Sequence, residues 1–474
     1  MRVPAFICLF LAAGLAVLVA PTRGNAAQRM PIGFMDDPAF RWSADAPQEL
    51  DKAKAAHASI VRTIANWSTI APRRPLRATN PFDPAYRLND LDELVRNAQT
   101  RGILVMITIW GTPKWANGGK GPNVAPTRAA DLTNFARALA SRYSGRYQDY
   151  PYVGRWSVWN EPNLGIFLTP QFGANGKIVS PSIYATLYQA GYRGIIAGNP
   201  HAHVAIGETS NQGRDHPLKG VHDSVAPGTF ARLLALHRGL EFTAYATHPY
   251  PTRPNLAPSQ QVRWPNVTLS RLPQFETSLD TWFHRKNIPV WITEYGYETQ
   301  PLQPFGVTQA TQARYLSTVL AKLRADPRVH MFVWFIFRDS SQSAWHSGLI
   351  GTTGKAKPAL RTFAGIAGRT VGVSKTVTPG VAPLVDVALP EIASASEPGA
   401  SIAVSYRVYL GTRVVASHQL STRLLMTQGI SLRPAFKPQA GKTYTLKLVA
   451  TDESGDRTSV TDALVAPAPP RRAS

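Results

Sequence analysis

The sequence predicts an α/β protein, a (β/α)8 TIM barrel followed by a small all-β sandwich. Strand-like and helix-like stretches alternate from residue 31 to residue 337, and this alternation is typical of a mostly parallel sheet. After residue 368 the pattern changes to alternating apolar and polar residues. The chain has 474 residues, which is too long for one ordinary hydrophobic core and indicates two globular domains.

Eight short apolar runs are the predicted strands of the barrel. They span residues 31–36, 59–64, 103–110, 155–159, 203–207, 242–248, 290–294 and 331–337. Stretches with helical spacing of apolar residues lie between them, at residues 46–58, 88–101, 127–147, 182–197, 229–240, 273–285 and 308–325. Ile32 and Val333 are 301 residues apart, or seven repeats of 43 residues. Repeats of this length fit strand–helix units that carry extended loops.

Two architectures use such repeats, the TIM barrel and the open doubly wound sheet. Eight units match the barrel, in which active sites lie at the carboxyl ends of the strands. The doubly wound sheet usually has a glycine-rich turn after its first strand. Here the first strand runs instead into Asp36, Asp37 and Pro38. The sequence therefore favours the barrel.

The C-terminal region has the pattern of a separate β domain. Residues 371–465 alternate apolar and polar side chains, with predicted turns at Gly411, Gly429 and Gly441. The hairpin at 441–455 resembles the last hairpin of an immunoglobulin- or fibronectin-like domain, which implies a sandwich. Such a domain could bind carbohydrate or attach to a cell wall, or it could buttress the barrel as a spacer. The few aromatic residues in this region favour the spacer.

The N-terminus has the layout of a secretory signal peptide. Arg2 precedes an apolar run at residues 3–20, and small residues follow around Ala26 and Ala27, where cleavage is expected. An uncleaved membrane anchor is the alternative, because the run is close to the ~20 residues that span a bilayer. Cys8, the only cysteine, lies in this leader, so the mature protein would contain no disulfide.

The net charge of +22 and the pI near 10.3 would attract acidic polysaccharide, anionic lipid or nucleic acid. The basic residues are scattered, however, and form no run that marks a nucleic-acid patch. The sequence has no zinc-finger spacing and no phosphate-binding glycine loop, and His201 and His203 lack acidic or cysteine neighbours at ligand spacing. We therefore expect no nucleic-acid partner, no metal and no cofactor.

Two glutamates end predicted strands and form the candidate catalytic pair. Glu161 follows the fourth strand and Glu294 ends the seventh, 133 residues or about three repeats later. In a barrel these strand ends face each other across the mouth. A carboxylate beside an apolar strand is costly unless function requires it. Glycoside hydrolysis requires such a pair, one carboxyl group to protonate the leaving oxygen and one to attack the anomeric carbon.

The motifs around these glutamates carry a family resemblance. Trp159-Asn-Glu-Pro-Asn163 and Ile292-Thr-Glu-Tyr-Gly296 resemble the clan A glycoside hydrolases, especially families 39 and 5. The resemblance covers residues 31–368 and implies that Glu161 is the general acid/base and Glu294 the nucleophile of a retaining mechanism. It also implies that Asn160 holds the sugar 2-hydroxyl.

Further positions match the same pattern. Arg62 resembles the strand-two arginine beside the nucleophile, and the loop that contains Trp115 resembles a family 39 loop after strand three. His248 and Tyr250 resemble the strand-six pair, and Trp334 falls near the strand-eight tryptophan. Arg62 and Tyr250 would favour the charged form of the nucleophile, whereas apolar surroundings would raise the proton affinity of the acid/base.

Several other side chains are candidates for substrate binding. Glu208 follows the fifth strand and is either a sugar ligand or the rival acid/base, although the Asn-Glu-Pro motif favours Glu161. Trp110, Trp115, Trp264 and Trp345 could each stack on a sugar ring or serve in packing, whereas strand residues such as Trp156, Trp159 and Trp291 are expected in the core or on the substrate floor. Asp36, Asp37 and Asp339 could each cap a loop or contact a sugar. Glu298 is expected to be solvated.

The predicted organisation is a signal peptide at 1–27, a catalytic barrel at 28–368, a β-sandwich at 369–465 and a disordered tail at 466–474. We expect a secreted, extracellular retaining glycoside hydrolase that acts on an oligo- or polysaccharide. It is expected to be a monomer with no stable membrane insertion after cleavage of the leader. The alternative is a secreted, non-catalytic carbohydrate-binding or cell-surface protein on a barrel scaffold.

Overall fold

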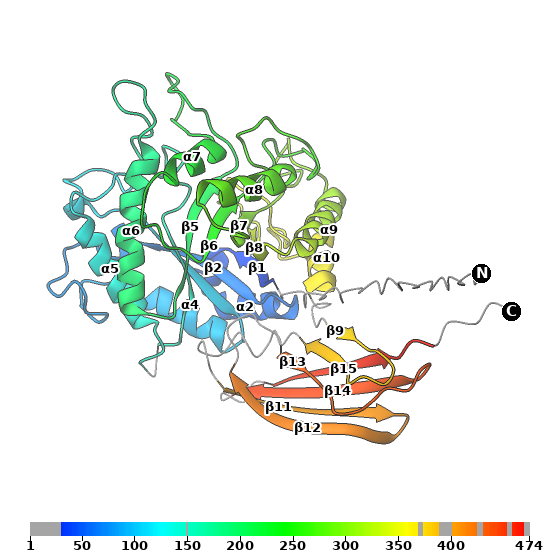
Figure 1. Ribbon diagram of the computed structural model, residues 1–474. Coiled ribbons are helices and arrows are strands. Elements are labelled where there is room, and N and C mark those ends of the chain that lie inside the picture. The colour runs from blue at the N-terminus through cyan, green and yellow to red at the C-terminus, as the bar shows by residue number, and fades with distance from the viewer. Residues whose placement is uncertain are drawn as a thin grey trace, which may run out of the picture.

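The computed structural model describes residues 30–147, 150–367, 373–387, 401–423, 430–452 and 457–468. Figure 1 shows a barrel ringed by helices and, apart from it, a group of C-terminal strands. The predicted signal peptide at 1–27 and residues 469–474 of the predicted tail lie outside the described residues, so both remain predictions, as do the domain boundaries. Within the described part of the chain, no helix has the length and apolar character needed to cross a membrane.

Eight parallel strands close into a barrel in chain order, which confirms the predicted TIM barrel. β1 pairs with both β2 and β8, so the sheet has no free edge. The predicted strands are confirmed within a few residues, although β2 and β5 each continue for two or three residues beyond the predicted end. The strands are β1 (Ile32–Met35), β2 (Ile60–Asn66), β3 (Leu104–Trp110), β4 (Arg155–Val158), β5 (His203–Ser210), β6 (Ala244–His248), β7 (Val290–Tyr295) and β8 (Val329–Phe335).

Helices cover the outside of the barrel, as Figure 1 shows. The helix predicted to reach residue 147 ends at Arg142, and Gly145 follows with a φ of 76° that a helix does not allow. The described helices are α1 (Asp37–Phe40), α2 (Ala46–Ala55), α3 (Trp67–Ile70), α4 (Asn89–Gln99), α5 (Ala129–Arg142), α6 (Ser180–Gly198), α7 (Pro227–Leu234), α8 (Leu272–Trp282), α9 (Gln309–Ala325) and α10 (Pro358–Ala367), with 3₁₀ turns η1 (Lys114–Ala116) and η2 (Leu269–Arg271).

The strands are buried on both faces, which explains why the sequence shows them as continuous apolar runs. One set of side chains fills the interior of the barrel, including Met106, Ala246 and Val333. The alternate set packs outward against the helices, including Phe332 and Trp334 of β8. Since successive strand residues point to opposite faces, the inward positions near the carboxyl ends are those that reach the mouth.

A buried ion pair joins α4 to α5. The guanidinium of Arg142 donates two hydrogen bonds to Asp92, at 2.8 and 2.6 Å, and the hydroxyl of Tyr143 donates a third at 2.7 Å. We expect Asp92→Ala to lower the free energy of unfolding by about 3–5 kcal/mol, because it leaves a buried guanidinium without its counter-ion. Urea unfolding followed by circular dichroism measures this change.

A matched control for that variant is Asp51→Ala. Asp51 also pairs with an arginine, Arg101, at 2.7 Å, but its side chain is largely exposed. Exposed pairs contribute little to stability, so the unfolding midpoint should stay near that of the native chain. Equal effects of the two substitutions would contradict the expectation that loss of the counter-ion costs more for a buried arginine than for an exposed one.

The C-terminal strands form two antiparallel sheets that share one core, which confirms the predicted β-sandwich. The sheets have the orders β13-β10-β9 and β12-β11-β14-β15. Apolar side chains from both, such as Val387, Val408 and Leu448, form a single cluster. Gly411 makes the turn between β11 and β12 with a φ of 60°, whereas the predicted turn at Gly429 lies outside the described residues. The strands are β9 (Val373–Thr376), β10 (Leu384–Val387), β11 (Ser401–Leu410), β12 (Arg413–Arg423), β13 (Ile430–Leu432), β14 (Thr443–Asp452) and β15 (Arg457–Val465).

Candidate active site

A cleft of about 340 Å³ opens at the carboxyl ends of the barrel strands. Its size lies within the ~300–1,000 Å³ range of small-molecule sites. Both predicted catalytic glutamates line it, which places them together at the mouth as expected. The described lining residues are Glu161, Ser210, Asn211, Gln212, Tyr250, Pro251, Thr252, Arg253, Pro254, Glu294, Gly296, Tyr297, Glu298, Phe335 and Trp345.

Glu161 projects from a strained segment just beyond β4. Trp159 and Glu161 have φ values of 74° and 39°, in a region that residues with a side chain seldom adopt. Backbone hydrogen bonds hold this conformation, from the Trp159 N–H to Ile109 at 2.7 Å and from the Glu161 N–H to Glu208 at 3.0 Å. Such strain persists only where the surroundings enforce it, and it is concentrated at functional sites.

Glu294 lies near the end of β7 and accepts hydrogen bonds on both carboxylate oxygens. Nη1 of Arg62 lies 2.5 Å from Oε1, and the hydroxyl of Tyr250 lies 3.2 Å from Oε2. Arg62 is itself fixed from inside the barrel, because its Nη2 donates to Asn160 at 2.8 Å and its Nε to Thr108 at 2.9 Å. The predicted neighbourhood of Arg62, Tyr250 and Asn160 around Glu294 is therefore present in the structure.

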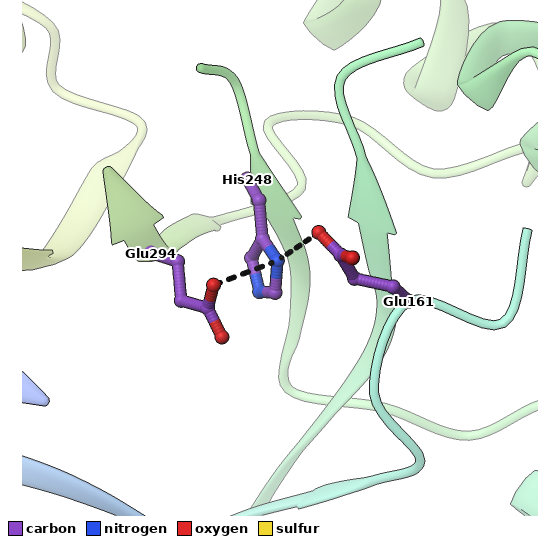
Figure 2. A group of neighbouring side chains, drawn as sticks. All are labelled: Glu161, His248 and Glu294. Atoms are coloured by element: carbon purple, nitrogen blue, oxygen red, sulfur yellow. Dashed lines mark hydrogen bonds and ion pairs between the residues drawn. The ribbon is translucent and has the colours of Figure 1, made fainter. Parts of the chain in front are cut away.

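His248, at the end of β6, lies between the two glutamates, as Figure 2 shows. Its Nδ1 is 2.9 Å from Oε1 of Glu161 and 3.6 Å from Oε2 of Glu294, and its Nε2 is 2.8 Å from Oε2 of Glu208. Burial alone would lower the pKa of this imidazole, but the surrounding carboxylates outweigh burial and raise the pKa of His248 to about 10. Both ring nitrogens face carboxylate oxygens, an arrangement that favours the imidazolium form, which donates from both nitrogens.

The two carboxyl groups of the candidate pair lie close together. One oxygen of Glu161, one of Glu294 and one nitrogen of His248 are all within 4.8 Å of one another. Burial raises the pKa of Glu161, and the negative charge of Glu294 adds to the rise, while His248 opposes it. The geometry therefore combines a carboxyl group that tends to keep its proton with a carboxylate held by two donors.

A group of two carboxylates and an imidazole could also suggest a metal site. Here each group already has a polar partner, since the imidazole faces carboxylates through both nitrogens and Glu294 is bonded to the Arg62 guanidinium. An imidazolium has no lone pair for a metal, and the neighbouring guanidinium repels a cation. The hydrogen bonds among the described residues explain the arrangement without a metal ion.

Glu208 was predicted to bind sugar or to rival Glu161, and the structure shows neither arrangement. Its side chain is 0 % exposed, beneath the floor of the cleft, so it cannot contact a substrate. β5 extends through Glu208 with a bulge at this point, and the bulge turns the side chain into the barrel. Burial would raise the pKa of Glu208, but the charge of Arg62 and the contact with His248 lower it to about 2.

The tryptophans divide between cleft and core. Trp345 lines the cleft, with its ring 5.5 Å from that of Tyr250. The prediction for Trp334 is wrong, because this side chain is 0 % exposed and packs outward from β8, while the next residue, Phe335, points inward and lines the cleft. Trp115 packs on Trp67 and bonds Ala71 at 2.8 Å, away from the cleft.

Other predicted candidates have local partners. Trp110 is half-buried, donates to the carbonyl of Phe167 at 3.2 Å and is not among the described residues that line the cleft. Trp264 packs against Trp282 of α8. The remaining strand tryptophans, Trp156, Trp159 and Trp291, are buried in the core.

The acidic residues near other strand ends serve mainly in capping. Asp36 accepts from the N–H groups of Ala39, Phe337 and Arg338, and Asp339 accepts from Gly348 at 2.7 Å and pairs with Lys357. Asp37 accepts from Thr63 and Ile64. Glu298 was expected to be solvated and is instead 5 % exposed, because it accepts from the His346 N–H and from Gln303.

The chain is similar to known glycoside hydrolases. The family model described as cellulase (glycosyl hydrolase family 5) matches residues 26–336. A family 39 glycoside hydrolase from Bacteroides cellulosilyticus WH2 has a TM-score of 0.53 at 17 % identity and covers 84 % of this chain and 80 % of its own. GH5_18 from Streptomyces cattleya, solved with GlcNAc, has a TM-score of 0.52 at 17 % identity, with 74 % and 84 % covered.

At 17 % identity these two structures establish the fold alone, and the search of curated proteins found no match. The family model carries more weight, because its match covers more than half of the chain and includes all eight barrel strands. The family resemblance inferred from the two glutamate motifs is thereby confirmed. The chain belongs to glycosyl hydrolase family 5, in clan A, and is a retaining glycoside hydrolase.

Proposed function

We propose that this protein hydrolyses an oligo- or polysaccharide by double displacement, with Glu294 as the nucleophile and Glu161 as the general acid/base. The observation that carries the assignment is the distance between the two groups, whose nearest oxygens lie within 4.8 Å. Retaining enzymes hold their carboxyl groups ~5–5.5 Å apart, whereas inverting enzymes need ~6.5–9.5 Å to admit a water molecule. The spacing supports direct attack by one of the carboxylates.

The contacts of the two glutamates support the division of roles. Glu294 accepts hydrogen bonds from Arg62 and Tyr250, so its carboxylate is held in one orientation. Glu161 has a raised pKa because it is buried, which suits a group that must carry a proton at the start of the cycle. Attack is thus assigned to the carboxylate that two donors orient, and proton donation to the carboxyl group whose burial favours its protonated form.

In the first step an oxygen of Glu294 forms a bond to the anomeric carbon while the bond from that carbon to the leaving oxygen breaks. The proton of Glu161 moves to the leaving oxygen, which departs as a hydroxyl group. In the second step Glu161 takes a proton from water, the water oxygen bonds to the anomeric carbon, and the ester to Glu294 breaks. Both glutamates return to their starting states and the sugar keeps its configuration.

The side chains that line the cleft support a carbohydrate substrate. Trp345 and Phe335 offer aromatic surface, and Ser210, Asn211 and Gln212 offer polar groups. Aromatic faces stack on sugar rings, and hydroxyl and amide groups bond sugar hydroxyls. Release of the protein from the cell remains part of this proposal and depends on the leader pattern at residues 1–27.

Proton NMR of the reaction mixture tests the proposal. Incubation with a panel of polysaccharides and aryl glycosides identifies a substrate, and spectra recorded before mutarotation show the anomeric configuration of the first product. The expected product has the configuration of the substrate. An inverted first product would contradict the double displacement.

A further inference from the structure

Glu208 is a buried charge that the two-step cycle does not use directly. It is held by the Nε2 of His248 at 2.8 Å, by the hydroxyl of Thr293 at 2.6 Å and by Nη2 of Arg62 at 3.4 Å. An ionised carboxylate in a dry site costs several kcal/mol unless it is paired. The barrel thus maintains a charge that touches no substrate, and its partners indicate what the charge acts on.

The backbone is built to direct this side chain inward. Glu208 has a φ of 51° and the preceding Gly207 a φ of 103°. A side chain at Gly207 would lie 2.6 Å from the ring of Tyr245, so glycine is required there. The Gly207 N–H donates to the hydroxyl of Tyr184 at 2.8 Å, which fixes the turn from outside the barrel.

The negative charge of Glu208 affects how firmly Glu161 holds its proton. When Glu161 carries its proton, the carboxylates of Glu208 and Glu294 balance the cations of Arg62 and His248. All of these groups lie in one connected set of hydrogen bonds and ion pairs. Without Glu208 the same state would carry a net positive charge, which favours loss of a proton.

Other charged and polar groups also face His248 and Glu208. His248 faces Glu161 from the end of β4, Glu208 from β5 and Glu294 from β7, and the Tyr250 ring lies 6.5 Å away. Glu208 faces Arg62 from β2, Ser157 from β4, Thr293 from β7 and Tyr184 from α6. Among these described groups, Arg62 and His248 are the cations that Glu208 balances.

We propose that Glu208 is a positioning residue: it orients His248 and, as the counter-ion of His248 and Arg62, offsets the two positive charges that would otherwise favour loss of the proton from Glu161 during turnover. Glu208 accepts from Nε2 of His248, which leaves the Nδ1 side directed at Glu161. Glu208 thus orients His248 toward Glu161, in the way that the carboxylate of a catalytic triad orients its histidine toward the reacting group. This inference rests on the proposed role of Glu161 as the acid/base.

The test is the pH profile of kcat/KM for Glu208→Gln. The substitution keeps the size of the side chain and a hydrogen-bond acceptor but removes the negative charge. Removal of a negative charge lowers the proton affinity of the His248–Glu161 pair. The alkaline limb should therefore move to lower pH by about one to three units, the usual effect of one nearby charge.

A matched control is Glu276→Gln on α8. Glu276 is also a buried glutamate, with its pKa raised to about 8 by burial and by Asp326, but it is outside the set around His248. Its alkaline limb should coincide with that of the native enzyme. A Glu208→Gln enzyme that loses activity evenly at all pH values, with no shift of the limb, would overturn the proposal and leave Glu208 a structural residue.

A measurement on the native enzyme keeps the proposal testable if the variant fails to fold. The imidazole ¹⁵N spectrum of histidine-labelled protein, with His248 assigned by comparison with His248→Gln, should show an imidazolium at pH 8. A neutral His248 at pH 8 would overturn the proposal. This readout needs no substrate, so it is independent of the roles proposed for Glu161 and Glu294, which fail separately if their own variants keep activity.

Discussion

Glu294→Gln is expected to lower kcat/KM by roughly 10⁴- to 10⁶-fold, the range found when one member of a nucleophile–base unit is removed. The amide is nearly the same size as the carboxylate, so the contacts with Arg62 and Tyr250 change little in shape, but the attacking charge is lost. Initial rates on the best substrate from the glycoside panel measure the loss. Circular dichroism of the variant shows whether the fold is retained.

The Glu294→Ala variant extends this test with azide. A small anion that enters the space left by the carboxylate attacks from the same face of the sugar, in a single displacement. The product expected is a glycosyl azide of inverted configuration. Retention of the native rate by either variant, or no azide product from a folded Glu294→Ala variant that still binds substrate, would contradict the role of Glu294.

Glu161→Gln is expected to lower kcat on unactivated glycosides by about 10²- to 10⁴-fold, which is the usual contribution of proton transfer. The first step should be nearly unaffected for aryl glycosides with very good leaving groups, because these depart without a proton. The second step still needs a base, so the glycosyl-enzyme should accumulate and produce a burst of released phenol. Stopped-flow absorbance measures the burst.

A second substitution at this position, Glu161→Ala, distinguishes the role of Glu161 from that of the buried Glu208. Azide added to Glu161→Ala should attack the glycosyl-enzyme and yield a glycosyl azide of retained configuration, opposite to that from Glu294→Ala. Glu208→Gln should not show this rescue, because its carboxylate is 0 % exposed and leaves no space open to the substrate. A uniform loss of rate for all leaving groups in Glu161→Gln would argue against proton donation by Glu161.

The fold, and the closeness of the two candidate glutamates at the barrel mouth, could be predicted from the sequence. Strands buried on both faces appear as apolar runs, and the change to period two after residue 368 separates the sandwich from the barrel. Glu161 and Glu294 were recognised because each is a charged residue that interrupts an apolar strand end at a fixed number of repeats. Their closeness follows from barrel closure, which brings distant strand ends to one mouth.

Burial of individual side chains was harder to predict. The error at Trp334 is a shift of one residue in β8, which exchanges the outward face for the inward face occupied by Phe335. The error at Glu208 arose because the bulge in β5 and the positive φ cannot be deduced from a strand pattern. Glu298 lies beyond Gly296 in a predicted loop and was therefore expected to be solvated; its burial depends on the N–H of His346, which is distant in sequence.

His248 shows most clearly what the structure adds. Its resemblance to a strand-six histidine predicts that it lies near the site, but not that it contacts Glu161 and Glu208 through opposite nitrogens. That arrangement depends on three strands meeting at one point in the barrel. Gln212 and Arg253 of the cleft wall were not predicted either, because they belong to loops whose course is set by tertiary contacts.

The most direct test of the catalytic assignment is covalent trapping. A 2-deoxy-2-fluoro glycoside with a good leaving group, in the sugar that the panel shows to be hydrolysed, should slow the second step and leave the sugar attached to the nucleophile. Intact mass of the full chain followed by peptide mapping locates the adduct. We predict one sugar per chain, attached to Glu294; an adduct on Glu161 or on Glu208 would contradict the account.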